Sequence, residues 1–94
     1  MLFLVIARDG SDDGALERRL AVRERHLSSA RALAEAGTLQ LGGAILDEDD
    51  TMIGSALLLE APDEAAVRAL LEADVYARSG VWERYEVHRF RRAV

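Results

Sequence analysis

The chain has 94 residues, half of them apolar and 31% charged, which is the composition of a single folded domain spanning residues 1–94. The formal net charge is −5 and no basic stripe interleaves with aromatic residues, so the composition argues against nucleic acid as a partner. The chain contains neither cysteine nor lysine, which excludes disulfides, thiolate catalysis and Schiff-base chemistry.

Membrane insertion and export find no support in the sequence. The apolar run at the start is too short for the core of a signal peptide and follows no basic residues. No stretch approaches the length of a membrane span. We therefore expect a cytoplasmic protein that has no membrane partner.

The first predicted elements are a strand and a long helix. Leu2–Ala7 is a short continuous apolar run, which is typical of a buried strand. The apolar residues of Leu16–Ala34 gather on one arc when each residue advances the helix by about 100°, so this segment is predicted to be an amphipathic helix. Gly37 stands where a helix C-cap glycine belongs. The polar turn before the helix offers three N-cap candidates, Ser11, Asp12 and Asp13.

Two strands joined by an acidic turn follow the helix. Thr38–Leu46 and Thr51–Glu60 are predicted strands, and Asp47–Asp50 between them is a solvated turn without the pattern of a calcium loop. The first of these strands contains Gly42-Gly43, which no helix follows, so the pair is not a phosphate loop. These glycines instead permit a bulge or the close approach of a ligand.

The remaining chain is predicted to form a second helix and a last strand. Asp63 is placed to cap the helix, whose apolar residues repeat at helical spacing. A loop or short turn over Asp74–Gly80 then leads to a strand over Trp82–Phe90. The order β-α-β-β-α-β is that of the α+β ferredoxin-like fold, in which both helices lie on one face of a four-stranded antiparallel sheet.

The predicted strands carry apolar residues on both faces. In the first strand one face presents three large aliphatic side chains, and the other face is also apolar: Leu2, Leu4 and Ile6 oppose Phe3, Val5 and Ala7. Two helices cover only one face of such a sheet, and a face in water would show alternation of apolar and polar residues. We therefore predict a homodimer in which the open sheet faces pack together.

A polar row runs along the helix face that should be buried. Arg19, Arg23 and His26 lie between two apolar flanks at spacings of four and three residues. Arginine is rarely buried, and burying it unpaired is costly, so the row is expected to line something wet, anionic or catalytic. The alternative is that the arginine stems lie over the edge of the core with their heads in water, while His26 is a satisfied core histidine.

Several segments of the chain together resemble the YCII-related family. They are the helix segment Leu16–Leu27, which carries an arginine, a second arginine and a His-Leu pair at the spacing of the family, the glycines Gly37 and Gly43, the Gly54-Ser55 pair, and the run Ala73-Asp74-Val75-Tyr76 followed by Ser79-Gly80-Val81. The resemblance implies a dimeric α+β barrel similar to the muconolactone isomerase type. It also implies a site built on a His-Asp pair, here His26 and Asp74. Some members of the family look like enzymes that act on hydroxylated or chlorinated aromatic rings.

The chain departs from the family pattern at two positions. Val75 stands where the family usually has a proline after the aspartate, and Ala44 replaces a proline that usually follows Gly43. Without the fixed φ of proline, the segment after Asp74 is expected to be less rigid.

The implied pair has a clear chemical use. If Asp74 accepts a hydrogen bond from one ring nitrogen of His26, the other nitrogen is left free as a base whose ordinary pKa lies near neutral pH. Arg23 could bind a carboxylate, enolate or phenolate, while Arg19 could do the same or merely line the rim.

Three further residues complete the predicted substrate site, namely Gly43, Ser55 and Tyr76. The hydroxyls of Ser55 and Tyr76 could donate hydrogen bonds to a substrate oxygen. The most economical function is an enzyme that needs no cofactor or metal and catalyses isomerisation or HX elimination on a small, anionic cyclic or aromatic substrate.

Each assignment has a plainer alternative. Asp74 could cap a turn or pair with a nearby arginine, and Tyr76 and Trp82 could be ordinary core or interface aromatics. A metal held by His26, Asp74 and a glutamate is conceivable, but one histidine is few for zinc. The whole chain could also be a non-catalytic module that binds an anionic metabolite or only dimerises.

Overall fold

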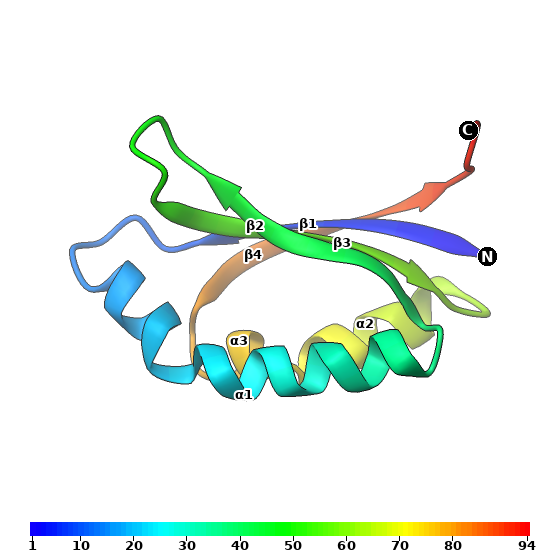
Figure 1. The fold of residues 1–94 in the computed structure, drawn as a ribbon, viewed down its shortest axis with the longest axis horizontal. Helices are drawn as coiled ribbons and strands as arrows, with labels where there is room; N and C mark the ends of the chain where they lie inside the picture. Colours follow the sequence, from blue (N-terminus) through cyan, green and yellow to red (C-terminus); the bar gives the residue numbers. More distant parts are fainter.

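Strands and helices follow one another in the order that the sequence predicts (Figure 1). The computed structural model describes all 94 residues. Its elements are β1 (Leu2–Asp9), α1 (Ala15–Glu35), β2 (Leu39–Leu46), β3 (Met52–Glu60), α2 (Glu64–Ala73), α3 (Val75–Arg78) and β4 (Trp82–Phe90). The short helix α3 occupies the segment that the sequence predicts as a loop or short turn.

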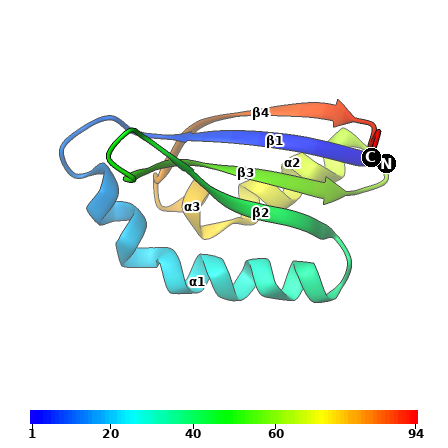
Figure 2. The same ribbon diagram turned by 45° about the horizontal axis from the view of Figure 1, so that its top comes forward.

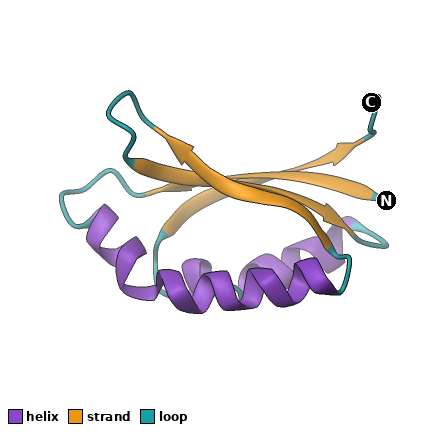
Figure 3. Cartoon of the chain, viewed as in Figure 1, coloured by secondary structure: helices purple, strands orange, loops and turns teal.

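The strands form a single antiparallel sheet in the order β2-β3-β1-β4. All the helices lie on one side of this sheet (Figures 1 and 3). Figure 2 shows α1 along the β2 edge and α2 nearer the β4 side. This topology confirms the ferredoxin-like α+β prediction, and it places the polar row of α1 opposite β2 and β3.

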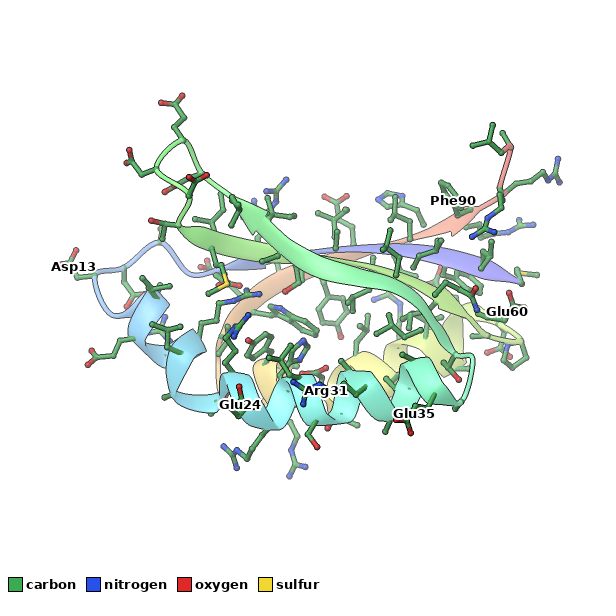
Figure 4. All side chains as sticks on the ribbon, in the orientation of Figure 1. Asp13, Glu24, Arg31, Glu35, Glu60 and Phe90 are labelled. Atoms are coloured by element: carbon green, nitrogen blue, oxygen red, sulfur yellow. The ribbon has the colours of Figure 1, made fainter.

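The hydrophobic core fills the space between the sheet and the helices (Figure 4). Alternate residues of the central strands point toward the helices, as the period of two in a strand requires. Helices α2 and α3 cover the core on the side opposite the sheet (Figure 4). Its buried apolar residues are Phe3, Val5, Ala7, Leu57, Leu59, Ala61, Val67, Leu71, Tyr76, Val81 and Trp82.

The helix ends agree with the predicted caps in two places and differ in one. The Asp63 side chain accepts a hydrogen bond from Ala66 N, and Gly37 ends α1 with a φ of +82°, as a C-terminal glycine in the left-handed region should. The N-cap of α1 is Gly14, which makes no side-chain cap, so the prediction of Ser11, Asp12 or Asp13 is wrong.

Asp12 makes an ion pair in place of the predicted cap. Its carboxylate accepts from both terminal nitrogens of Arg18, at 2.9 and 2.7 Å. This hydrogen-bonded pair lowers the pKa of the Asp12 carboxyl to about 2. A side chain committed to Arg18 is not available to the free N–H groups of the first turn.

The face of the sheet that the helices leave open is apolar near its centre. Leu4 of β1 and Leu58 of β3 are paired there and are half-buried in the single chain. Phe90 projects from the end of β4 on the side away from the helices (Figure 4) and is 41% exposed. Toward β4 the face becomes polar, with an exposed His88 hydrogen-bonded to Glu86 at 2.9 Å.

Candidate active site

A cavity of about 250 Å³ lies between α1, α3 and the strands β2 and β3. Its lining includes six of the seven site residues predicted from the sequence, namely Arg19, Arg23, His26, Gly43, Ser55 and Tyr76. Apolar side chains form the remaining wall, with Leu27, Ala30, Leu39, Met52 and Leu57 among them. Two wider surface depressions, of about 490 and 500 Å³, contain neither His26 nor Asp74. The predicted polar row therefore faces this cavity, with Arg23 at its exposed side.

His26 and Asp74 come together behind this cavity. His26 Nδ1 lies 2.8 Å from Asp74 Oδ1, although the two residues are 48 positions apart in the chain. An ionised carboxylate can only accept, so in the neutral imidazole this contact places the proton on Nδ1 and leaves the lone pair on Nε2. Nε2 has no hydrogen-bond partner in the protein and is not a buried atom, so it remains available to a ligand.

Packing holds the imidazole ring in place. The ring of His26 stacks on Tyr76 with centroids 3.8 Å apart and planes inclined by 9°. The rings of Trp82 and His26 form a T-shaped pair with centroids 5.9 Å apart. With one nitrogen fixed by Asp74 and one face covered by Tyr76, His26 has little freedom to rotate.

Asp74 also caps a helix, so two of the interpretations offered by the sequence hold at once. Its Oδ1 accepts from the backbone N–H of Tyr76 at 2.9 Å, which begins α3. The same carboxylate thereby positions both rings of the His26–Tyr76 stack. It forms no ion pair with Arg78 or Arg23, which the sequence left open.

Arg19 lies at the buried end of the polar row and is only 3% exposed. Its Nη1 donates to both carboxylate oxygens of Asp9, at 3.1 and 3.0 Å, and the guanidinium carbon lies 4.8 Å from the Tyr76 ring centroid. The sequence left open that Arg19 lines a rim or extends its guanidinium into water. The burial of Arg19 contradicts both alternatives. Its charge is already matched inside the protein.

Asp9 is the residue that the sequence analysis missed. The apolar run ends at Ala7, so the sequence predicts that the strand stops there, whereas β1 continues to Asp9. The available signal was the polar row itself, because a buried arginine requires a carboxylate and an acid directly after a central strand can supply one.

Arg23 has a different environment one helical turn away. It lines the cavity, its side chain is largely exposed, and no carboxylate lies within ion-pair distance of it. Arg23 is therefore the unpaired cation of the cavity.

The two hydroxyl groups are both placed at the cavity. Ser55 Oγ accepts from Arg19 Nη2 at 3.1 Å and from Trp82 Nε1 at 3.2 Å. Burial raises the pKa of the Tyr76 phenol, an effect that the nearby charges of Arg19 and Arg23 oppose. The Tyr76 hydroxyl thus stays protonated at neutral pH and can donate a hydrogen bond.

Gly43 contributes less than its place in the sequence indicates. A Cβ at Gly43 would meet no atom within 4 Å, whereas a Cβ at Gly42 would lie 3.2 Å from Leu57 Cδ2. The register shift in this part of β2 falls between Leu39 and Leu41, ahead of the glycine pair. The backbone of Gly43 lines the cavity, but the position where a side chain would be crowded is Gly42.

The sequence model of the YCII-related domain matches residues 1–91. The chain belongs to the YCII-related family. Protein YciI of Escherichia coli is 33% identical to it over 98 residues, which cover 98% of each chain. A protein of Emericella nidulans named derivative of benzaldehyde biosynthesis cluster protein C is 38% identical over 72 residues, 69% of this chain and 74% of that protein.

Solved structures resemble this member of the family in fold. The 5-chloro-2-hydroxyhydroquinone dehydrochlorinase of Burkholderia phenoliruptrix, in complex with 2,5-dihydroxybenzoquinone, superposes with a TM-score of 0.83 at 29% identity, covering 97% of this chain and 94% of its own. That relative is an enzyme that acts on a small aromatic ring. An antibiotic biosynthesis monooxygenase, at 16% identity and a TM-score of 0.56, shares the fold only.

The departure of this chain from the family at Val75 has a simple structural reading. Val75 is the first residue of α3, directly after the Asp74 cap. This is the helical position that favours proline, yet any residue with helical φ can occupy it. The hydrogen bonds of Asp74 to His26 and to Tyr76 N are formed without the proline.

The structure contains neither a cluster of metal-ligating side chains nor a helix suited to a membrane. No group of three or more histidine, cysteine, aspartate or glutamate side chains converges anywhere, so the conceivable site of His26, Asp74 and a glutamate is not formed. None of the helices is both long and apolar enough to span a membrane.

Proposed function

We propose that this chain is an enzyme that moves a proton on a small, anionic ring substrate, with His26 as the acid-base group. The observation that carries the proposal is the arrangement of His26, whose Nδ1 contacts Asp74 at 2.8 Å while Nε2 is unpartnered beside the cavity. A base fixed in one tautomer and directed at a ligand-sized cavity is the arrangement that general base catalysis requires.

The reaction class follows from the groups present. His26 Nε2 takes a proton from the ring or from a ring hydroxyl, and the electron pair left behind forms the new double bond. In HX elimination the halide then leaves with its bonding pair; in isomerisation the proton returns at another carbon. A positioned general base contributes about 10²–10⁴-fold in rate. This gain is sufficient for a substrate whose ring already makes the proton acidic.

Size and charge indicate the substrate class. A cavity of about 250 Å³ is small for a drug-sized ligand and suits a single substituted ring. Arg23 supplies the unpaired positive charge, so a phenolate, enolate or carboxylate is the group expected beside it. The dehydrochlorinase with bound 2,5-dihydroxybenzoquinone, at 29% identity, supports a hydroxylated ring.

The test uses 5-chloro-2-hydroxyhydroquinone as the probe and measures chloride release by the full chain. We expect His26→Ala to lower kcat by about 10²–10⁴-fold, and Arg23→Gln to act mainly on KM because it removes charge that binds the ring. Arg25→Gln is the matched control, since Arg25 lies beside a separate surface depression near α3. It should leave both constants unchanged.

Two outcomes would contradict the proposed enzymatic function. One is full turnover by His26→Ala. The other is a wild-type chain that binds the ring without releasing chloride. If that binding survives His26→Ala and is lost in Arg23→Gln, the chain is a module that binds an anionic metabolite.

We also propose that the working form is a homodimer joined through the open sheet face. The centre of that face carries Leu4 and Leu58, which the helices cannot cover because they all lie on the other side. A second copy of the same apolar surface is self-complementary under a two-fold axis and removes these side chains from water.

A further inference from the structure

The hydroxyl of Ser55 has an unusual set of neighbours. Its Oγ accepts from Arg19 Nη2 at 3.1 Å and from Trp82 Nε1 at 3.2 Å. A serine hydroxyl has two lone pairs and one proton, while guanidinium and indole N–H groups can only donate. Both lone pairs are therefore occupied, and the proton has no acceptor within the protein.

Neither donor is free to turn away. Arg19 is clamped by Asp9 through contacts of 3.0 and 3.1 Å and is 3% exposed. Trp82 is buried at the start of β4. Losing either contact would leave a buried N–H without a partner, which opposes rotation of these side chains.

We infer that Ser55 is a dedicated hydrogen-bond donor to a substrate oxygen, and that Asp9, Arg19 and Trp82 are positioning residues that hold it in this state. Ser55 lines the cavity that also holds His26. A charged donor on its oxygen polarises the O–H bond and makes it a stronger donor. The inference rests on the proposed function, because the oxygen in question belongs to the ring that His26 deprotonates.

This assignment limits the chemical class of the substrate. A group that can only donate, such as an ammonium, finds no acceptor at Ser55. A carbonyl, phenolate or enolate oxygen accepts the proton, and the contact strengthens as negative charge develops on that oxygen during the reaction. The proton itself stays on Ser55, so no covalent step is added.

The orientation can be observed directly in the full chain without any ligand. In a neutron crystal structure of deuterated protein, we expect the Ser55 deuteron on the cavity side of Oγ. A deuteron directed at Asp9 or at a backbone carbonyl would overturn the inference. This readout does not involve His26, so its failure is distinguishable from failure of the proposed enzyme.

The role of the positioning residues is tested by a double-mutant cycle with 2,5-dihydroxybenzoquinone as the probe. We expect Ser55→Ala and Trp82→Phe each to weaken its binding, measured by calorimetry, by about 2- to 10-fold, as expected for one hydrogen bond. If Trp82 acts through Ser55, Trp82→Phe should add nothing in the Ser55→Ala background. Independent, additive losses would mean that Trp82 only packs the core. An unchanged dissociation constant in Ser55→Ala, or a probe that the wild-type chain does not bind, would count against the donor role.

Discussion

Arg19 and Arg23 lie one turn apart on α1, yet their surroundings give them opposite roles. Arg19 is buried and bound to Asp9, Ser55 and the face of Tyr76. Arg23 lies at the cavity without an ion pair. The two charges of a buried ion pair neutralise each other, so such a pair mainly has a structural role. An exposed and unpaired guanidinium, in contrast, can bind an anion.

This difference predicts opposite effects on stability. Arg19→Gln should lower the free energy of unfolding by about 3–5 kcal/mol, because it leaves the Asp9 carboxylate buried without its partner. Arg23→Gln should change it by less than about 0.5 kcal/mol, as expected of a surface position. Urea denaturation followed by the fluorescence of Trp82 measures both. Equal losses in the two variants would show that the Arg19–Asp9 pair is not a structural contact.

At the scale of elements, the site depends on how closely β1 and β3 approach each other. A Cβ on Gly54 would lie 2.3 Å from the carbonyl oxygen of Ala7, a distance that no side chain tolerates. Gly54 directly precedes Ser55 in β3, and Ala7 of β1 precedes the stretch that ends in Asp9. The glycine therefore lets the strand that carries Ser55 meet the strand that carries Asp9.

A matched pair of alanine substitutions tests this close approach. Gly54→Ala should cost about 1–3 kcal/mol, because the backbone of β1 must move to admit the methyl group. Gly43→Ala on β2 should cost little, since its Cβ meets no atom within 4 Å. Thermal unfolding of both variants provides the comparison. A melting temperature for Gly54→Ala equal to that of Gly43→Ala would refute the role given to Gly54.

The whole molecule has one covered and one uncovered sheet face. Helices α1, α2 and α3 all pack on one side of the sheet. The cavity, the His26–Asp74 pair and the contacts of Arg19 therefore lie together between the sheet and the helices. The opposite face presents Leu4 and Leu58 to the outside. The proposed catalytic site and the proposed dimer interface thus lie on different faces, and a change on one face should leave the other intact.

The proposed dimer is tested by two leucines on different surfaces. Leu58→Glu places a charge at the centre of the open face and should convert the dimer to a monomer, because the pairing of two copies would bury that charge twice. Leu20→Glu is the control, since Leu20 is 53% exposed on α1. Sedimentation velocity gives the mass of each variant. A wild-type chain that sediments as a monomer, or a Leu20→Glu variant that also dissociates, would rule out the proposed interface.

Much of this architecture can be predicted from the sequence, because short-range patterns determine it. The continuous apolar run of β1, the helical spacing around Arg19, Arg23 and His26, and the caps at Gly37 and Asp63 depend on neighbouring residues only. The resemblance to the YCII-related family then added the pairing of His26 with Asp74, which periodicity alone could not supply.

Only the tertiary structure decided which of these residues touch and which remain free. The partner of Arg19 is Asp9, which precedes the helix and lies beyond the predicted end of the first strand. The two donors on Ser55 come from α1 and from β4, elements that the fold brings together from far apart in the chain. Burial is the physical reason. Outside water an unpaired charge is costly, and only the packed chain determines which partner lies within reach. The sequence by itself therefore determined the elements and the polar row, and the packing decided that Arg19 is structural while Arg23 is free.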